Sequence, residues 1–217
     1  MKNIDWSSFI SNIISVVLGI VITFGIQGMI DRHREKTDVM SALELVKEEL
    51  VNNRTSLGEA IGIIDHEKGA ARYVLDSVAV CSVDTLNVLN QILGNEYYFT
   101  VTDDALELLK SSSLFSKIND KNLALGIIKS YDYLGASSGA FNTHEKIKTE
   151  LYQELNTDEV KKASISTTNA AFMKSFFSSK DATYFLYSVQ EMSNSAFLKD
   201  GIPEIESTIA AIEARLK

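Results

Sequence analysis

The sequence predicts an all-α fold: an N-terminal transmembrane helix, followed by a long amphipathic helix and a helical bundle of about five to six further helices. Three observations lead to this prediction. The chain of 217 residues contains one proline, a residue that breaks helices and is frequent in loops. Apolar residues recur at alternating steps of three and four along much of the chain, as they do on one face of a helix. Neither an internal repeat nor the pattern of a parallel sheet is found in it.

Residues 9–30 form the predicted transmembrane helix, after an N-terminal tail at 1–8. This stretch has no charged side chain, and a helix of that length rises about 33 Å, close to the roughly 30 Å hydrocarbon core of a bilayer. A removable signal has a shorter apolar run that ends in small residues at a cleavage site, and Gly25, Gln27 and Met29 do not form such a site. A buried core helix rarely avoids charge for so long. We therefore expect an uncleaved span.

The charges on either side of the span bear on its orientation. Lys2 stands before it, and Arg32, Arg34 and Lys36 follow it. Lysine and arginine near a span concentrate on the cytoplasmic side. The chain is therefore predicted to be a single-pass protein of the inner (cytoplasmic) membrane with its bundle in the cytoplasm; a periplasmic bundle is the alternative. We expect Trp6 and the three basic residues after the span at the membrane interface, in contact with the lipid bilayer.

A stripe of small and polar residues follows one face of the predicted span, with Ser15, Gly19 and Thr23 four residues apart. Small residues at this spacing let two helix backbones approach closely in lipid. The stripe therefore predicts self-association of the span, which makes a homo-oligomer one candidate assembly. Chance is the other explanation, because glycine, serine and threonine are common in such helices.

The soluble domain, 31–217, is expected to begin with a long helix at 31–79. Its apolar and small positions follow one stripe: Leu43, Val46, Leu50, Asn53, Leu57, Ala60, Ile64, Ala71 and Val74. Glu67 interrupts this stripe. Asn53 lies on it, where an asparagine either fixes the register of a two-stranded coiled coil or, in a single bundle, bonds a neighbouring backbone group or water.

The rest of the domain is expected to divide into a helical hairpin region at 82–135 and C-terminal helices at 136–217. Caps, glycines and apolar spacing predict helices at 83–93, 103–111, 119–155, 157–177, 181–199 and 203–217. Ser82 and Thr102 are the expected caps of the first two of these. The aromatic and β-branched residues 95–101 are expected to form an ordered loop, because no partner strand is evident.

Composition excludes several classes of function. The chain carries 29 acidic and 21 basic residues, a formal net charge of −8. An acidic chain repels a phosphate backbone, so no nucleic acid is expected among its partners. The lone cysteine, Cys81, excludes an internal disulfide and a cysteine-rich zinc site, and we expect its thiol to be buried or inert.

Each candidate for a catalytic or metal site fails on its spacing. His66 and His144 both stand in the tripeptide His-Glu-Lys. A helical zinc protease needs a second histidine four residues after the first, where this chain has Ala70 and Lys148. We expect both tripeptides on solvated helix faces. The sequence predicts no catalytic residue, no metal ligand and no cofactor, and the chain is not expected to be an enzyme.

The stretch from Thr102 to Leu134 resembles a segment of an uncharacterised bacterial family of small single-pass membrane proteins. The positions that carry the resemblance are Gly19 to Ile22 in the span, Glu49 to Asn53 in the long helix, and Ala105, Glu107, Leu109, Lys110, Ser111, Ser112, Ile118, Leu123 and Tyr131 in the stretch itself. The chain departs from the family pattern at Ser113, where the pattern has glycine. It also departs at Tyr131 to Tyr133, where adjacent tyrosines are usual. The resemblance implies an N-terminal span and a long helix; because the family has no assigned activity, it implies no site residues.

These observations favour a membrane-anchored helical scaffold, adaptor or sensor-accessory protein without catalytic activity. It would act as a homo-oligomer or with an unidentified membrane or cytoplasmic protein partner. The alternative is an exported ligand-sensing helical bundle. Such a bundle would have to signal through a partner membrane protein, because the sequence has no second apolar run of about 18 residues.

Overall fold

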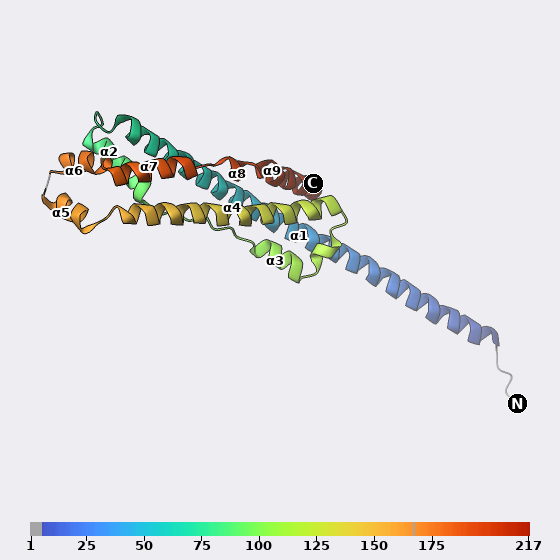
Figure 1. Ribbon diagram of the computed structural model, residues 1–217. Coiled ribbons are helices and arrows are strands. Elements are labelled where there is room, and N and C mark those ends of the chain that lie inside the picture. The colour runs from blue at the N-terminus through green and yellow to red at the C-terminus, as the bar shows by residue number, and fades with distance from the viewer. Residues whose placement is uncertain (1–5, 167) are drawn as a thin grey trace.

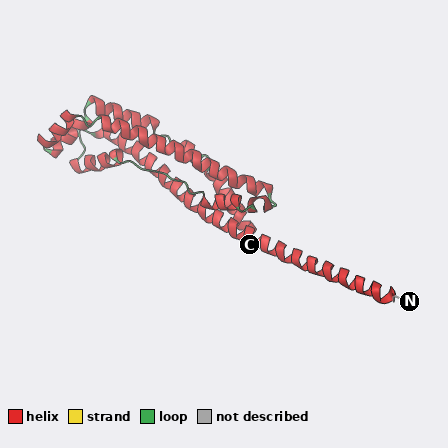
Figure 2. Cartoon of the chain, turned by 90° about the horizontal axis from the view of Figure 1, so that it is seen from below, coloured by secondary structure: helices red, strands yellow, loops and turns green. Residues whose placement is uncertain are grey.

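Helices make up all the regular structure in the described part of the chain, so the predicted all-α class is confirmed. The structure is a computed structural model that describes residues 6–166 and 168–217, with side chains at Gln27, at Met29 and throughout from Asp31 except at residue 167. Helix α1 (Trp6–Ser77) is one continuous helix of 72 residues. Its first part projects beyond the bundle and its later part packs within it, as two perpendicular views show (Figures 1 and 2).

The remaining elements fold back along the later part of α1 (Figure 1). In order they are α2 (Val83–Gly94), α3 (Asp104–Ser111), the 3-10 helix η1 (Leu114–Lys117), α4 (Lys121–Glu154), α5 (Asp158–Ser166), α6 (Asn169–Phe177), α7 (Lys180–Met192), α8 (Ala196–Lys199) and α9 (Ile202–Leu216). Within the described residues, eight α-helices thus follow α1, and the prediction of five to six was too low.

The two additional helices arise because two segments that were each predicted to form one helix are each divided into two. The predicted helix 157–177 becomes α5 and α6, and the Thr168 side chain caps α6 by accepting a hydrogen bond from the Ala171 amide. The predicted helix 181–199 ends at Met192 and resumes at Ala196 as the short α8. By contrast, the boundary drawn between 135 and 136 falls inside the continuous α4.

Caps account for where most of the other helices begin. The Ser82 side chain caps α2 by accepting from the Thr85 amide, and the Asp120 side chain caps α4 by accepting from two amides of its first turn. The expected cap of α3 was wrong: the N-cap residue is Asp103, and Thr102 is bonded elsewhere. Residues 95–103 have neither helix nor strand, so the prediction of a loop is confirmed.

Two hydrophobic cores follow one another along the bundle. The first packs the middle of α1 against α3, α4 and α9, and its fully buried residues include Leu43, Leu50, Leu57, Leu109, Ile127, Leu134, Ile205 and Ile212. The second packs the end of α1 against α2, α6 and α7, and includes Val74, Leu86, Leu93, Phe177, Phe185 and Leu186. Burial of one such side chain stabilises the fold by about 1.5–3 kcal/mol, so the two cores supply most of the stabilising free energy.

The predicted stripe on the long helix is confirmed, because each of its nine positions from Leu43 to Val74 is buried. Cys81 is buried as expected. In α7, Tyr184 and Tyr187 are exposed, and the buried face of the helix contains Phe185, Leu186 and Val189.

The predicted span at 9–30 lies almost wholly on residues whose side chains are outside the description. Its backbone continues without a break into the rest of α1. Among the residues described, no helix holds an apolar stretch long enough to cross a membrane. Residues 1–5 and the side chains of residues 6–26, 28 and 30 lie outside the described part of the chain, so the tail at 1–8 and the span stay predictions.

One residue that departs from the resembled family pattern has an unusual backbone. Ser113 follows α3 with φ 61° and ψ 7°, the left-handed region that costs a residue with a Cβ about 1–2 kcal/mol. It is the single non-glycine residue with positive φ in the described chain. Glycine adopts this conformation without that cost, which explains in physical terms why a pattern of this kind would have glycine there.

Replacing Ser113 with glycine is therefore expected to raise the free energy of unfolding by about 0.5–1 kcal/mol, after the greater freedom of glycine in the unfolded chain is deducted. Urea unfolding of the full chain in a mild neutral detergent measures it. Ser112→Gly is the matched control: with φ −76° at Ser112 it should lower stability instead. Two changes of the same sign would contradict the assignment of strain to Ser113.

Candidate functional site

A layer of polar side chains separates the two hydrophobic cores. On α1, Glu67 lies between Ile64 of the first core and Ala70 of the second. On α4, Glu145 and Lys148 lie between Phe141 of the first core and Leu155 of the second. Ser193 and Ser195 stand in the same position in the linker from α7 to α8. These buried polar residues of α1, α4 and the linker thus stand between the two cores along the chain.

The buried charge cluster, formed by Glu67, His144, Glu145 and Lys148, is the centre of this layer. The Lys148 Nζ donates to Glu67 Oε1 and, at 2.7 Å, to Glu145 Oε2. It also donates at 2.7 Å to the carbonyl of Asn95. His144 Nε2 lies 3.0 Å from the other Glu67 oxygen. The side chains of Glu67 and Lys148 have no solvent-accessible surface, and that of Glu145 has 1%.

This cluster corrects the interpretation of the two His-Glu-Lys tripeptides, which were expected on solvated faces. His66 is exposed, but Glu67 next to it is fully buried. In the second tripeptide, His144 and Glu145 are buried in the cluster and only Lys146 is exposed. The prediction failed because it treated each tripeptide alone, whereas the charges are neutralised across two helices far apart in the sequence.

The cluster holds two carboxyl groups, those of Glu67 and Glu145, against the single ammonium of Lys148. Burial raises the pKa of Glu145 above its ordinary 4.5, and the nearby charge of Glu67 adds to this, while hydrogen bonds from Lys148 and the Tyr97 amide oppose it. Glu145 Oε2 accepts from both Lys148 and Tyr97. Its Oε1 accepts no hydrogen bond within the described residues and lies 3.8 Å from His144 Nε2. A buried charge without full compensation is costly.

A metal ion is the obvious alternative occupant of such a cluster. Glu67, His144 and Glu145 each offer a ligand atom within 4.8 Å of the others. The Lys148 ammonium, however, already bonds a carboxylate oxygen of both glutamates. A second cation there would be repelled at close range by the ammonium. The arrangement is therefore that of a buried salt-bridge network.

The loop at 95–103 passes directly over the cluster and is held by side chains. Asn142 accepts from the Phe99 amide and donates to the Phe99 carbonyl, both at 3.0 Å. Asn53 does the same at Thr102, accepting at 3.0 Å and donating at 2.7 Å. Of the two alternatives for Asn53, the bond to a neighbouring backbone group is the one observed. The loop thereby obtains from side chains the hydrogen bonds that a partner strand would otherwise give.

Four of the residues on which the resemblance was built, Glu49, Asn53, Ala105 and Tyr131, meet at the end of this loop. Glu49 accepts from the Ala105 amide through both carboxylate oxygens, at 3.1 and 3.2 Å. The Tyr131 hydroxyl donates to Glu49 as well, and burial raises the pKa of that hydroxyl. Together with Asn53, these residues clamp the start of α3 between α1 and α4. Their role in this structure is to hold the fold.

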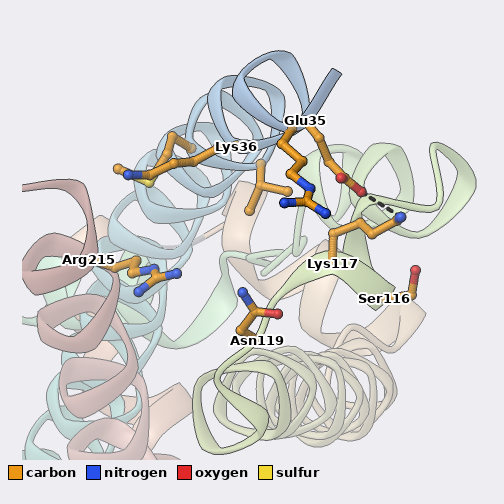
Figure 3. Close-up of a pocket in the computed structure, with 9 residues that line it drawn as sticks. Glu35, Lys36, Ser116, Lys117, Asn119 and Arg215 are labelled. Atoms are coloured by element: carbon orange, nitrogen blue, oxygen red, sulfur yellow. Dashed lines mark ion pairs between the residues drawn. The ribbon is translucent and has the colours of Figure 1, made fainter. Parts of the chain in front are cut away.

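A second charged site lies at the other end of the bundle, where α1 leaves it. This basic pocket is a cavity of about 360 Å³ lined by Arg32, Glu35, Lys36, Val39, Met40, Ser116, Lys117, Asn119 and Arg215. Its labelled side chains come from α1, η1, the turn before α4 and the end of α9 (Figure 3). Lys117 pairs with Glu35 at 2.5 Å. Arg32, Lys36 and Arg215 form no ion pair within the described residues.

The structure places only part of the predicted interface residues in this pocket. Arg32 and Lys36 line it, whereas Arg34 is exposed outside it. The side chains of Trp6, Ser15, Gly19 and Thr23 lie outside the described residues, so their predicted roles stay predictions.

Sequence reasoning missed Lys117 and Arg215, which line the pocket from other elements. No spacing signal links them to α1, because they stand far from it in the sequence. Only the docking of η1 and α9 onto α1 brings them to the pocket.

Replacing Lys148 with methionine is expected to lower the free energy of unfolding by about 3–5 kcal/mol, because it leaves two buried carboxylates without their cation. Lys146→Met is the matched control on the same helix. Lys146 is exposed and pairs with Glu150 at 3.9 Å, so its loss should cost no more than about 0.5 kcal/mol. Urea unfolding of both variants measures these changes. Equal decreases in the free energy of unfolding would contradict the role given to the buried cluster.

The raised pKa of Glu145 predicts how stability depends on pH. Its carboxyl binds a proton more tightly in the folded chain than in the unfolded one. Its contribution to stability is therefore complete below pH 4.5 and is lost as the pH rises through the raised pKa. Relative to Glu145→Gln, which cannot titrate, the wild type should lose stability over that interval. Unfolding curves at a series of pH values measure the difference; parallel pH profiles would contradict it.

Comparison with models of protein families, with curated proteins and with solved structures finds no match to this chain. The resemblance built on Glu49, Asn53 and the stretch from Thr102 to Leu134 therefore stays an expectation.

Proposed function

We propose that this chain is a membrane-anchored helical scaffold or adaptor without catalytic activity. The observation that carries the proposal is the continuity of α1. The charge-free stretch 9–30 and the stripe that organises the first core belong to one uninterrupted helix. The first part of that helix projects beyond the rest of the bundle (Figures 1 and 2). A charge-free helix of that length in water would expose a large apolar surface, which a bilayer removes.

The same continuity supports a mechanical role. No proline and no loop separates residue 30 from the first core at Val39. A helix that contributes to both cores moves with the bundle as one body. Any tilt or rotation of the proposed span would therefore be passed to both cores, as a scaffold or sensor-accessory protein requires.

The charged groups also favour a scaffold over an enzyme. Within the described residues, Glu67, Glu145 and Lys148 are fully buried, and both carboxylates bond the one Lys148 ammonium. Of the cluster, His144 borders a cavity of about 170 Å³, whose other lining residues include Ile64, Phe141 and Leu198. A catalytic site needs charged or nucleophilic groups that converge on a space open to substrate.

Two charges placed in the middle of the proposed span test the anchor. Val17→Arg with Ile20→Arg should move the protein from the membrane pellet to the soluble or aggregated fraction, because the two arginines cost about 5–7 kcal/mol at a bilayer centre. Membrane fractionation with carbonate washing measures this. Leu45→Arg is the control, since Leu45 is exposed on the same helix and its replacement should leave the chain in the membrane.

Release of the wild-type chain from membranes by carbonate would contradict the proposed membrane anchor.

The side of the membrane on which the bundle lies can be tested with a reporter fused after Lys217. A fluorescent protein that folds only in the cytoplasm should be bright there. Alkaline phosphatase activity at that position would instead place the bundle in the periplasm, and would favour the exported sensor.

A further inference from the structure

The basic pocket is a site without an assigned occupant. We propose that it binds the phosphate of an anionic phospholipid headgroup, and so fixes the bundle against the membrane surface. The inference rests on the proposed function, because it takes the membrane as the source of its ligand. Three properties of the pocket support it: its charge, its height above the proposed span, and its lining.

The pocket concentrates positive charge in an acidic protein. Four cations line it against the single carboxylate of Glu35, and that carboxylate is paired with Lys117. Arg32, Lys36 and Arg215 line the cavity and form no ion pair within the described residues. The sequence as a whole carries a formal net charge of −8. Cations held close together without counter-charges repel one another, and an anion placed between them relieves that repulsion.

The height of the pocket matches the headgroup layer of a bilayer. Arg32 stands two residues past the end of the charge-free stretch, and Lys36 six residues past it. At about 1.5 Å per residue, these side chains start about 3 to 9 Å beyond the hydrocarbon core. The headgroup layer occupies roughly the first 5–8 Å on each side. A phosphate at that depth lies within reach of both side chains.

The residues that line the pocket suit a phosphate ester better than a metal cation or an apolar molecule. Guanidinium groups bind phosphate through two parallel hydrogen bonds, and two such groups line the pocket, Arg32 of α1 and Arg215 of α9. Asn119, whose side chain lies between Arg215 and Lys117 in Figure 3, adds a neutral amide donor. Val39 and Met40 provide the apolar part of the wall, against which the glycerol carbons of a lipid can pack. A volume of about 360 Å³ accommodates a headgroup.

The pocket exists only when the bundle is assembled. Arg215 lies in the last turn of α9 and Lys117 in η1, so both reach α1 through tertiary packing. An anionic headgroup bound there would bridge the start of the soluble part of α1 and the end of α9. It would thereby stabilise the folded bundle as well as set its orientation on the membrane.

The test is a lipid titration of the full chain in a neutral detergent. Short-chain phosphatidylglycerol, phosphatidylcholine and inorganic phosphate are compared by native mass spectrometry and by the shift in unfolding temperature. Phosphatidylglycerol should bind and raise that temperature, and phosphatidylcholine should not. Arg32→Gln, Lys36→Gln and Arg215→Gln together should weaken binding roughly 100-fold, at about fivefold for each cation near an anionic surface.

Two further variants keep this result interpretable. Arg72→Gln with Lys146→Gln and Lys162→Gln removes three exposed cations from the far half of the bundle and should leave lipid binding unchanged. Arg215→Gln alone changes one exposed side chain near the end of α9, where misfolding is least expected. It should weaken binding about fivefold.

Three outcomes would overturn the proposal: equal binding of phosphatidylglycerol and phosphatidylcholine by the wild type, equal losses in the pocket and far-half variants, or a pocket that inorganic phosphate fills while phosphatidylglycerol does not. The last would assign the pocket to a soluble phosphate. Because binding is measured in detergent, a chain that fails to stay in membranes would remove the proposed anchor alone. If the chain stays in membranes but the triple pocket variant binds lipid as the wild type does, the proposed anchor stands and the proposed lipid site does not.

Discussion

The loop at 95–103, which side chains of α1 and α4 hold in place, is the constraint on which the rest of this structure depends. Residues 95–103 have no helix and no partner strand in the described chain, yet Phe99 points into the core. A buried amide or carbonyl without a partner costs about as much as a lost hydrogen bond. Polar side chains must therefore enter the interior. Those that bond the loop backbone are Asn53, Ser138, Asn142, Glu145 and Lys148.

Once these polar groups are inside, they restrict how α1 and α4 fit together. Lys148 and His144 of α4 bond Glu67 of α1. Tyr131 of α4 donates to Glu49 of α1, and apolar side chains of the two cores make up the rest of the contact between these helices. A slip of one turn, about 5.4 Å, would still bury apolar side chains but would separate the ammonium from the carboxylate. Because unpaired buried charges cost several kcal/mol, the cluster selects one register among those that the apolar stripe alone allows.

The sequence predicted the parts of the fold that depend on one helix at a time. The stripe from Leu43 to Val74 and the loop at 95–101 were found from local pattern. The buried charges were not, because Glu67 and Lys148 look like surface residues until α4 lies beside α1. Even so, the sequence holds a signal: Glu67 stands three residues after Ile64 and four before Ala71, in step with the buried stripe. The pocket residues Lys117 and Arg215 offer no comparable pattern.

The length of α1 sets what a protein of this shape can do in the proposed arrangement. From residue 31 to Ser77 the helix rises about 70 Å, and the basic pocket and the buried cluster lie about 50 Å apart along it. The first core is then close to the membrane, and the second stands well clear of it. Headgroups can touch only the near end. A partner that recognises the far end, where Tyr184 and Tyr187 are exposed, must therefore meet it in the aqueous phase, so the buried cluster lies on the path between membrane and partner.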